Sequence, residues 1–187
     1  EWAQIWHLSY PEGETRQITS DLFEYRTISL SADGTQLVTI PTTGSSDIWS
    51  LSLSGDQPPR KISQSRQDGF RGFAFAPDGR ILYQTQEAGR IDFAFMNADG
   101  SERQRLTDDH EVYRYPTFAP DGSIVYWANP PTGPELRRME ADGTNPRFLA
   151  SSNYWAKPDI SPDGFWVYYS KFTDGISQIW RVPIDGG

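Results

Sequence analysis

The sequence contains no cysteine, and only two histidines and two methionines occur among its 187 residues. The lack of cysteine excludes disulfides, thiolate metal sites and cysteine nucleophiles, and two histidines leave little for a histidine-based metal site. The longest hydrophobic runs, such as 165–169, are far too short to span a membrane. Acidic residues outnumber basic ones by 25 to 17, a formal net charge of −8, which argues against a nucleic-acid partner.

What the chain has in abundance is a repeat. With 14% aromatic residues its composition is that of a globular protein, and a turn tetrapeptide ending in Asp-Gly recurs along it. The aspartates of this turn are Asp33, Asp78, Asp121 and Asp163. A second Gly-containing turn series and a series centred on Ile18, Ile62, Leu106 and Leu149 have the same period. Three series with one period indicate a repeat protein.

Within each period the turns delimit short strands. Pro-Asp-Gly suits a type I turn followed by a left-handed glycine, which is a hairpin connection. The segments 36–40, 80–85, 123–128 and 165–170 are rich in Val, Ile, Leu and aromatic residues, as strands buried on both faces would be. Third strands are predicted at 5–8, 48–51, 93–96, 136–139 and 179–182, with the Ile18 series on the fourth strands. We expect an all-β chain with little or no helix.

Four antiparallel strands in roughly 43 residues is the period of a β-propeller blade. Ser-Pro-Asp-Gly at 161–164, the aromatic strand after it, Gln178-Ile179-Trp180 and Ile184-Asp185-Gly186 resemble the WD-like repeats of TolB-type propellers. Such blades occur in the TolB envelope protein, in prolyl-oligopeptidase-type peptidases and in extracytoplasmic parts of bacterial sensor proteins. The resemblance covers essentially the whole chain and implies an architecture more than an activity.

The predicted strands do not complete a ring. Two fall in 1–19, four in each of the blade pieces 21–63, 64–107 and 108–150, and three in 151–187. That is about four and a quarter blades in one partial propeller over 1–187. We expect a piece of a longer propeller; a ring completed by two chains and a four-bladed ring are the alternatives. Open end blades would present apolar faces and unpaired edges, so we expect self-association.

The start of the first strand carries a second pattern, an aromatic residue followed by a cation. Its members are Tyr25 and Arg26, Phe70 and Arg71, Tyr113 and Arg114, and Trp155 with Lys157. First strands line the central channel of a propeller, so these residues would surround one channel mouth and attract an anionic group or acidic peptide. Alternatively, each aromatic packs between blades and each arginine pairs with a neighbouring acid such as Asp21, Asp68 or Asp109.

Two departures from the repeat bear on a ligand. The third-strand position held by Trp6, Trp49 and Trp180 is Ala94 and Arg137 in the other blades. Neighbours such as Phe95 or Trp127 could compensate, or the change could leave room for a ligand or a partner side chain. The run from Asp108 to Glu111 is metal-like in composition only, because consecutive residues rarely converge on one ion. We expect a solvated acidic loop there, with no metal or other cofactor.

No G-x-S-x-G, HExxH, Walker or dinucleotide motif is present. The favoured interpretation is a non-catalytic binding or scaffold module that interacts with a protein or peptide or senses a ligand. Family resemblance implies a periplasmic or extracytoplasmic location in a bacterial envelope or sensor protein. The alternative is the gating propeller of a prolyl-oligopeptidase-type serine peptidase whose catalytic domain lies outside this chain. Neither interpretation makes these residues catalytic or calls for nucleic acid or membrane insertion.

Overall fold

The computed structural model describes residues 4–9, 11–19, 24–42, 46–65, 67–87, 90–109, 111 and 113–186. The side chains of Glu24, Arg26, Pro41, Thr42 and Glu87 lie outside this description. The described residues form β-strands, turns and loops without a helix. Within them, accordingly, there is no helix long and apolar enough to cross a membrane.

The chain divides into two compact units, Glu1–Phe70 and Arg71–Gly187, which we call the N-terminal and the C-terminal unit. The N-terminal unit holds a two-stranded sheet of β1 (Trp6–Leu8) and β2 (Thr15–Gln17). Its second sheet has four strands, β3 (Glu24–Leu30), β4 (Gln36–Thr42), β5 (Trp49–Ser52) and β6 (Arg60–Lys61). The repeat did not predict the boundary after Phe70, which falls inside the predicted blade piece 64–107.

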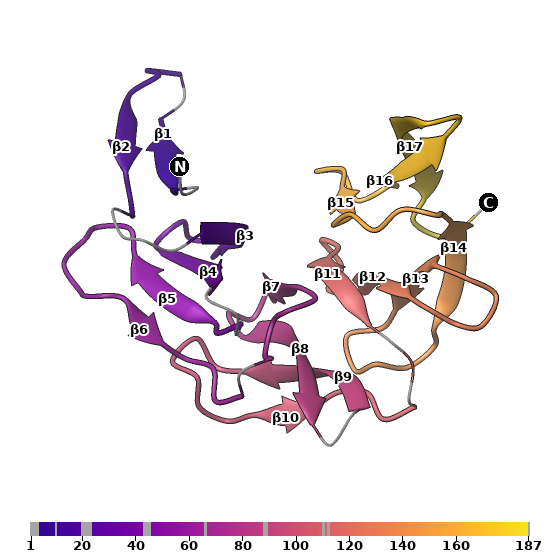
Figure 1. Cartoon of the computed structure of the whole chain (residues 1–187), viewed down its shortest axis with the longest axis horizontal. Helices are drawn as coiled ribbons and strands as arrows, with labels where there is room; N and C mark the ends of the chain where they lie inside the picture. The colour runs from indigo at the N-terminus through magenta and orange to yellow at the C-terminus, as the bar shows by residue number, and fades with distance from the viewer. Residues whose placement is uncertain are drawn as a thin grey trace. The chain divides into compact units, whose positions relative to one another are not determined.

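The C-terminal unit holds three sheets, each with its strands in chain order (Figure 1). The first comprises β7 (Phe73–Phe75), β8 (Ile81–Glu87), β9 (Arg90–Met96) and β10 (Gln104–Arg105). The second comprises β11 (Arg114–Phe118), β12 (Ile124–Ala128), β13 (Glu135–Met139) and β14 (Arg147–Ser151). The third comprises β15 (Asp159–Ile160), β16 (Trp166–Thr173) and β17 (Ile176–Pro183). All pairings are antiparallel, and the described residues form the seventeen strands that the repeat predicts.

The Asp-Gly turns form the predicted hairpin connections. Gly122 donates its N–H to the Ala119 carbonyl at 2.9 Å and has a φ of 85°, which favours glycine over residues with a Cβ. The Asp121 carboxylate accepts hydrogen bonds from the backbone N–H and the hydroxyl of Ser123, at 2.9 and 2.7 Å. Although burial opposes it, these bonds and the charge of Arg138 lower the pKa of Asp121. The turns that contain Gly34, Gly79 and Gly164 repeat the backbone hydrogen bond.

The hairpin of β16 and β17 is longer than the repeat predicts. Pairing continues to Thr173 opposite Ile176, so only Asp174 and Gly175 connect the strands. Both connecting residues have positive φ, 52° and 80°, as a type I′ turn requires. A tight turn at Asp174 and Gly175 therefore connects the two strands, and the paired strands extend past the ends of β15.

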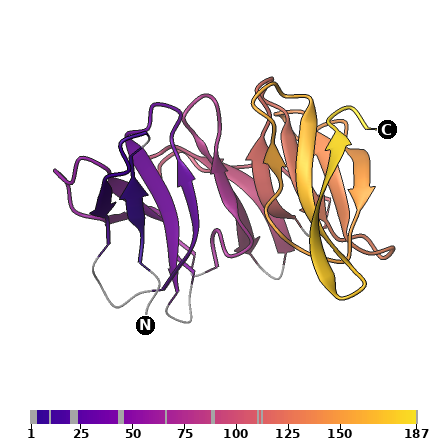
Figure 2. The same cartoon turned by 90° about the horizontal axis from the view of Figure 1, so that it is seen from above.

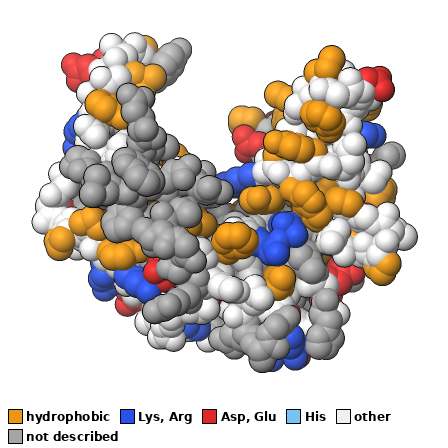
Figure 3. Space-filling view, in the orientation of Figure 1, with side chains coloured by type: hydrophobic (Ala, Val, Ile, Leu, Met, Phe, Trp, Pro, Cys, Tyr) orange, Lys and Arg blue, Asp and Glu red, His pale blue; other side chains and the backbone are white. Residues whose placement is uncertain are grey.

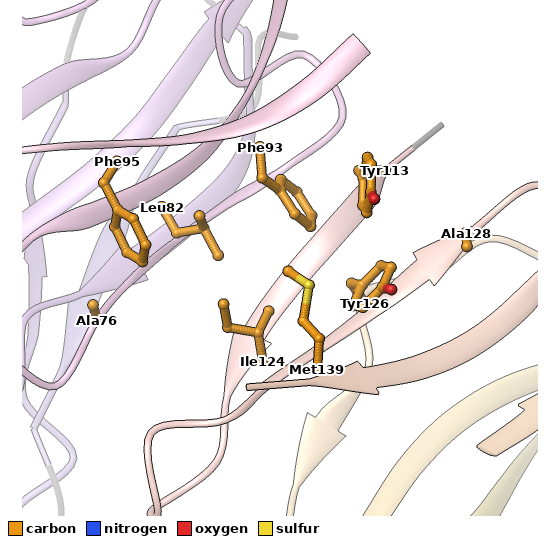
Figure 4. Close-up of a cluster of buried hydrophobic side chains, with 9 residues drawn as sticks. All are labelled: Ala76, Leu82, Phe93, Phe95, Tyr113, Ile124, Tyr126, Ala128 and Met139. Carbon is orange, nitrogen blue, oxygen red and sulfur yellow. The ribbon is translucent and has the colours of Figure 1, made fainter. Parts of the chain in front are cut away.

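Strand β12 is buried on both faces, as its sequence predicts. Ile124 and Tyr126 face the sheet of β7–β10, where they meet Phe93 and Tyr113 in one apolar cluster (Figure 4). The Tyr113 and Phe93 ring centroids lie 5.0 Å apart, and those of Tyr113 and Tyr126 lie 5.3 Å apart. Aromatic pairs at such distances contribute beyond the apolar area they bury. This cluster joins the first two sheets of the C-terminal unit.

The opposite face of β12 joins the second sheet to the third, and the two lie face to face in Figure 2. Val125 and Trp127 of β12 pack against Val167 and Tyr169 of β16. The Trp127 and Tyr169 rings meet edge to face with centroids 6.1 Å apart. A separate cluster in the N-terminal unit brings Ile5, Leu37 and Leu51 together.

The fourth strands end in a hydroxyl interaction that the sequence analysis missed. In the sheet of β7–β10, the N–H groups of Leu106 and Thr107 both point to the Phe93 carbonyl, at 2.8 and 3.3 Å. The Thr107 hydroxyl accepts the Phe93 N–H at 3.0 Å. Thr19 and Ser63 accept the N–H of Ile5 and Ile48 in the same way, at 2.9 and 3.0 Å. The fourth strands of these sheets therefore stop where a Ser or Thr follows the apolar residue.

We expect Thr107→Val to destabilise the chain by about 1–3 kcal/mol, because the buried Phe93 N–H loses its acceptor. The control is Thr144→Val, since the Thr144 hydroxyl bonds to Asp142 on an exposed turn where water can replace it. Urea denaturation followed by tryptophan fluorescence measures both free energies of unfolding. Equal losses in the two variants would contradict the interpretation.

Candidate functional site

The predicted cation-and-aromatic residues are divided between the two units. Tyr25 and Phe70 lie in the N-terminal unit, where Tyr25 packs on the Leu37 cluster and Phe70 is exposed. The side chain of Arg26 and the whole of Asp21 lie outside the described residues. The other predicted residues belong to the C-terminal unit: Arg71, Tyr113, Arg114, Trp155 and Lys157. These five residues lie in one unit, so their relative positions can be described.

The starts of the first strands β7 and β11 touch through their backbones. Tyr115 donates its N–H to the Arg71 carbonyl at 2.6 Å. Gly72 sits so close to Tyr115 that a Cβ on it would lie 2.8 Å from the Tyr115 Cα. The pairing of β11 with β12 shifts register just after Arg114, and Tyr115 has a φ of 49°. Such irregularities redirect side chains, and here they bring Arg71 and Arg114 to one junction.

Arg114 stacks on an aromatic ring rather than pairing with an acid. Its guanidinium carbon lies 4.4 Å from the centre of the Trp155 ring. Its Nε is buried without a hydrogen-bond acceptor among the described residues. Burial and the positive charge of Arg71 both lower the pKa of Arg114. The predicted alternative, an arginine paired with Asp109, therefore does not describe Arg114.

The nearby acids are engaged elsewhere. Asp109 accepts the hydroxyl of Tyr113 at 2.6 Å, and burial together with this bond raises the pKa of Tyr113 well above its ordinary value. Glu111 and Glu135 both pair with Arg137, each with an N–O distance of 2.8 Å. Although burial opposes it, these carboxylates raise the pKa of Arg137.

Trp155 and Lys157 continue the site toward β15. The Trp155 ring meets Trp127 edge to face at 6.0 Å, and the Trp127 indole N–H donates to the Ala156 carbonyl at 2.8 Å. Lys157 keeps exposed surface, yet the protein around its amine lowers the pKa of that group, which Asp159 only partly offsets. In Figure 3, Lys and Arg side chains gather beside hydrophobic ones over β11.

Both substituted third-strand positions have close neighbours. Ala94 is buried opposite Tyr83. Arg137 replaces the indole with a guanidinium that Glu111 and Glu135 both bind. Compensation thus comes from cross-strand and ion-pair neighbours, whereas Phe95 and Trp127 pack into the two inter-sheet clusters.

The acidic run after Thr107 is exposed at Asp108 and Asp109, as expected, and its carboxylates also have partners within the unit. Asp108 forms ion pairs with Arg90 and Arg105. Asp109 and Glu111 have the partners described above, and His110 lies outside the described residues. Among the side chains that the structure describes, no three His, Asp or Glu residues gather as metal ligands do.

The repeated antiparallel sheets, with their strands in chain order, are those of a β-propeller, and comparison with known proteins specifies which kind. The model of the TolB β-propeller domain family, with PD40 repeats, matches residues 13–187. The chain therefore belongs to this family, as its repeats suggested.

Solved structures agree. The chain is similar to TolB from Acinetobacter baumannii, with a TM-score of 0.85 and 17% identity over 98% of this chain and 46% of that one. It is also similar to a putative TolB from Agrobacterium tumefaciens, with a TM-score of 0.78 and 23% identity over 93% of this chain and 63% of that one. The likeness to a puromycin hydrolase has a TM-score of 0.70 and 14% identity, and it covers 92% of this chain but 29% of the hydrolase. At these identities the likeness concerns the fold, and the chain spans about half to two thirds of the TolB proteins' length.

Gly72→Ala should destabilise the chain by more than about 3 kcal/mol. The added Cβ would meet the Tyr115 backbone at 2.8 Å, and it would also be strained at a φ of 114°. Gly79→Ala is the control, because Gly79 has positive φ but open space around its Cβ position, so only the strain of about 1–2 kcal/mol applies. Urea denaturation compares the two, and a Gly72→Ala loss no larger than the control's contradicts the close junction.

Proposed function

We propose that the chain supplies a non-catalytic binding surface of a TolB-type propeller, and that its partner is a protein or peptide carrying an acidic group. The observation that supports this most is Arg114, which lies beside the like charge of Arg71 and stacks on Trp155 without a carboxylate partner among the described residues. An arginine that lacks a carboxylate partner and lies beside a like charge creates a field that an anionic ligand would relieve.

The contrast with Arg137 and Arg138 strengthens the proposal. Each of these arginines, in the same sheet, binds two carboxylates: Glu111 and Glu135 for Arg137, Asp121 and Asp185 for Arg138. Two arginines of the strand β13 are thus each supplied with two acids. Arg114 is not, and an aromatic surface around it is a common feature of protein interfaces.

The proposed setting is the periplasm or another extracytoplasmic compartment, in an envelope or sensor protein. Its support is membership of the TolB propeller family, and the chain would report or scaffold there while other parts of the protein carry any chemistry. The gating propeller of a peptidase is the second candidate, and the likeness of the fold to part of a puromycin hydrolase supports it. The parent gene discriminates them: a G-x-S-x-G motif beyond residue 187 favours the peptidase, and further Ser-Pro-Asp-Gly repeats favour the binding module.

Arg114→Met should weaken binding of a hexaglutamate peptide about tenfold or more, because a charge-assisted hydrogen bond is worth about 1.5–3 kcal/mol. Arg71→Met should act in the same direction. Isothermal titration calorimetry at two salt concentrations measures the affinity and its salt dependence. Arg181→Met is the matched control, since Arg181 also stacks on an indole, at 4.1 Å from the Trp166 ring centre.

Melting temperatures of these variants separate binding from folding. Lost binding with unchanged melting supports the proposal. A large fall in melting temperature with binding intact would instead assign Arg114 a structural role, and failure of the wild-type chain to bind hexaglutamate would remove the acidic partner.

A second copy of the chain is also a proposed partner. On the third sheet of the C-terminal unit, Val167 and Tyr169 face the core, while the opposite face presents Tyr168, Phe172 and Ile179, the last 80% exposed. Within the described residues only Tyr154, stacked on Phe172, adds a ring contact to these three. Within the same unit, the sheets β7–β10 and β11–β14 bury the apolar faces that they turn toward each other.

Light scattering over a wide concentration range should therefore give a mass near twice 21.2 kDa for the chain. Ile179→Asp should shift the mass toward 21.2 kDa, because it charges the apolar face, whereas Thr144→Asp on an exposed turn should not. A single monomer mass at all concentrations would refute self-association.

A further inference from the structure

Three chain segments meet in a hydrogen-bonded junction at the start of β11. The Gln84 side-chain carbonyl accepts the N–H of Arg71 at 3.0 Å, and the Gln84 backbone N–H donates to the Gly72 carbonyl at 3.1 Å. The Arg71 carbonyl accepts the Tyr115 N–H at 2.6 Å. Gln84 therefore bonds directly to Arg71, and Arg114 precedes the residue that bonds to the carbonyl of Arg71.

This junction contains two buried donors without acceptors. Gln84 is 0% exposed, and because its carbonyl oxygen bonds to Arg71, its amide nitrogen is the end left over. That Nε2 atom has no hydrogen-bond partner among the described residues, and neither has the Nε of Arg114. Buried polar groups are nearly always hydrogen-bonded, so two unpaired donors at one junction point to an acceptor from outside.

The charge at the junction has the sign that an anionic acceptor needs. Besides burial, the positive charge of Arg71 is close enough to lower the pKa of Arg114. In the preceding loop, Asp109 is bound to Tyr113 and Glu111 to Arg137. Trp155 lies against one face of the Arg114 guanidinium, which holds its plane in place. The left-handed backbone of Tyr115 and the close approach of Gly72 fix the two segments relative to each other.

We propose that this junction binds one carboxylate group, with one oxygen accepting from the Gln84 amide and the other from Arg114 Nε. The proposal rests on the function proposed above and specifies the acidic group as a side-chain or terminal carboxylate. A carboxylate is planar and has two oxygens for these two donors. A phosphate has further oxygens, and the two donors would leave these buried and unpaired.

Gln84→Glu tests the proposal by building the carboxylate into the chain. One oxygen of the new side chain can still accept the Arg71 N–H, and the other can accept from Arg114. The expected melting temperature at pH 7 is equal to or above that of the wild type. Gln86→Glu, on the same strand but partly exposed, controls for the added charge. A Gln84→Glu variant that melts well below this control, or does not fold, overturns the proposal, because it shows a buried charge without a partner.

Nuclear magnetic resonance provides the second test. Sodium acetate, added at constant ionic strength, should shift the side-chain amide signal of Gln84 and the Nε–H signal of Arg114 together and saturably. Inorganic phosphate should shift them much less, and neither probe should move the Arg114 signal in Gln84→Glu. No acetate response, or an equal response to phosphate, refutes a carboxylate site.

Hexaglutamate binding distinguishes the carboxylate junction from the wider cationic surface. If Gln84→Glu binds the peptide as tightly as the wild type while Arg114→Met does not, the cationic surface stands and the carboxylate junction is wrong. If neither variant changes the affinity, both proposals fail. Loss of at least tenfold in both variants, with unchanged melting, supports both.

Discussion

Burial of β12 on both faces is the constraint on which the C-terminal unit depends. Tyr126 and Trp127 are adjacent in the sequence and both essentially inaccessible to solvent, yet they point into different inter-sheet clusters. Each buried side chain of this size is worth about 1.5–3 kcal/mol, which neither face can gain unless a neighbouring sheet covers it. No sheet of this kind is stable alone, so the repeat must stack, and every sheet at an end of a stack leaves one apolar face for a partner.

Stacking leaves the two ends of each sheet with different tasks. At one end lie the Asp-Gly turns, whose carboxylates accept hydrogen bonds from the residues that follow them, as Asp121 does from Ser123. Arg138 pairs with both Asp121 and Asp185 and so links this turn to the one that follows β17. The antiparallel order places the starts of the first strands at the opposite end, where the connections are long loops. Variation is tolerated in such loops because the turns and clusters hold the strands, so Arg114 and Trp155 stand where binding residues usually do.

Local signals account for what the sequence predicts well. Pro-Asp-Gly fixes a turn by the φ preferences of its own residues, and a strand such as 123–128 shows its double burial in its own composition. Contacts between segments distant in sequence leave no such local signal. The closeness of Gly72 to Tyr115 depends on which first strands touch, and the unpaired amide of Gln84 depends on its bond to Arg71. The Thr19, Ser63 and Thr107 hydroxyls did leave a signal, since they recur at one period beside the apolar series, but Ala150 interrupts it.

The predicted aromatic-and-cation pattern combined two physical roles that the structure separates. Tyr113 is a core residue: it packs between Phe93 and Tyr126 and engages Asp109. That bond and the pairing of Glu111 with Arg137 engage the two acids that are nearest to Arg114 in the sequence. The local carboxylates therefore bind Tyr113 and Arg137, and Arg114 keeps only its stacking contact with Trp155. The positive charge of Arg71 makes an unpaired Arg114 electrostatically unfavourable. The acidic partner that we propose would supply the missing negative charge and relieve this repulsion.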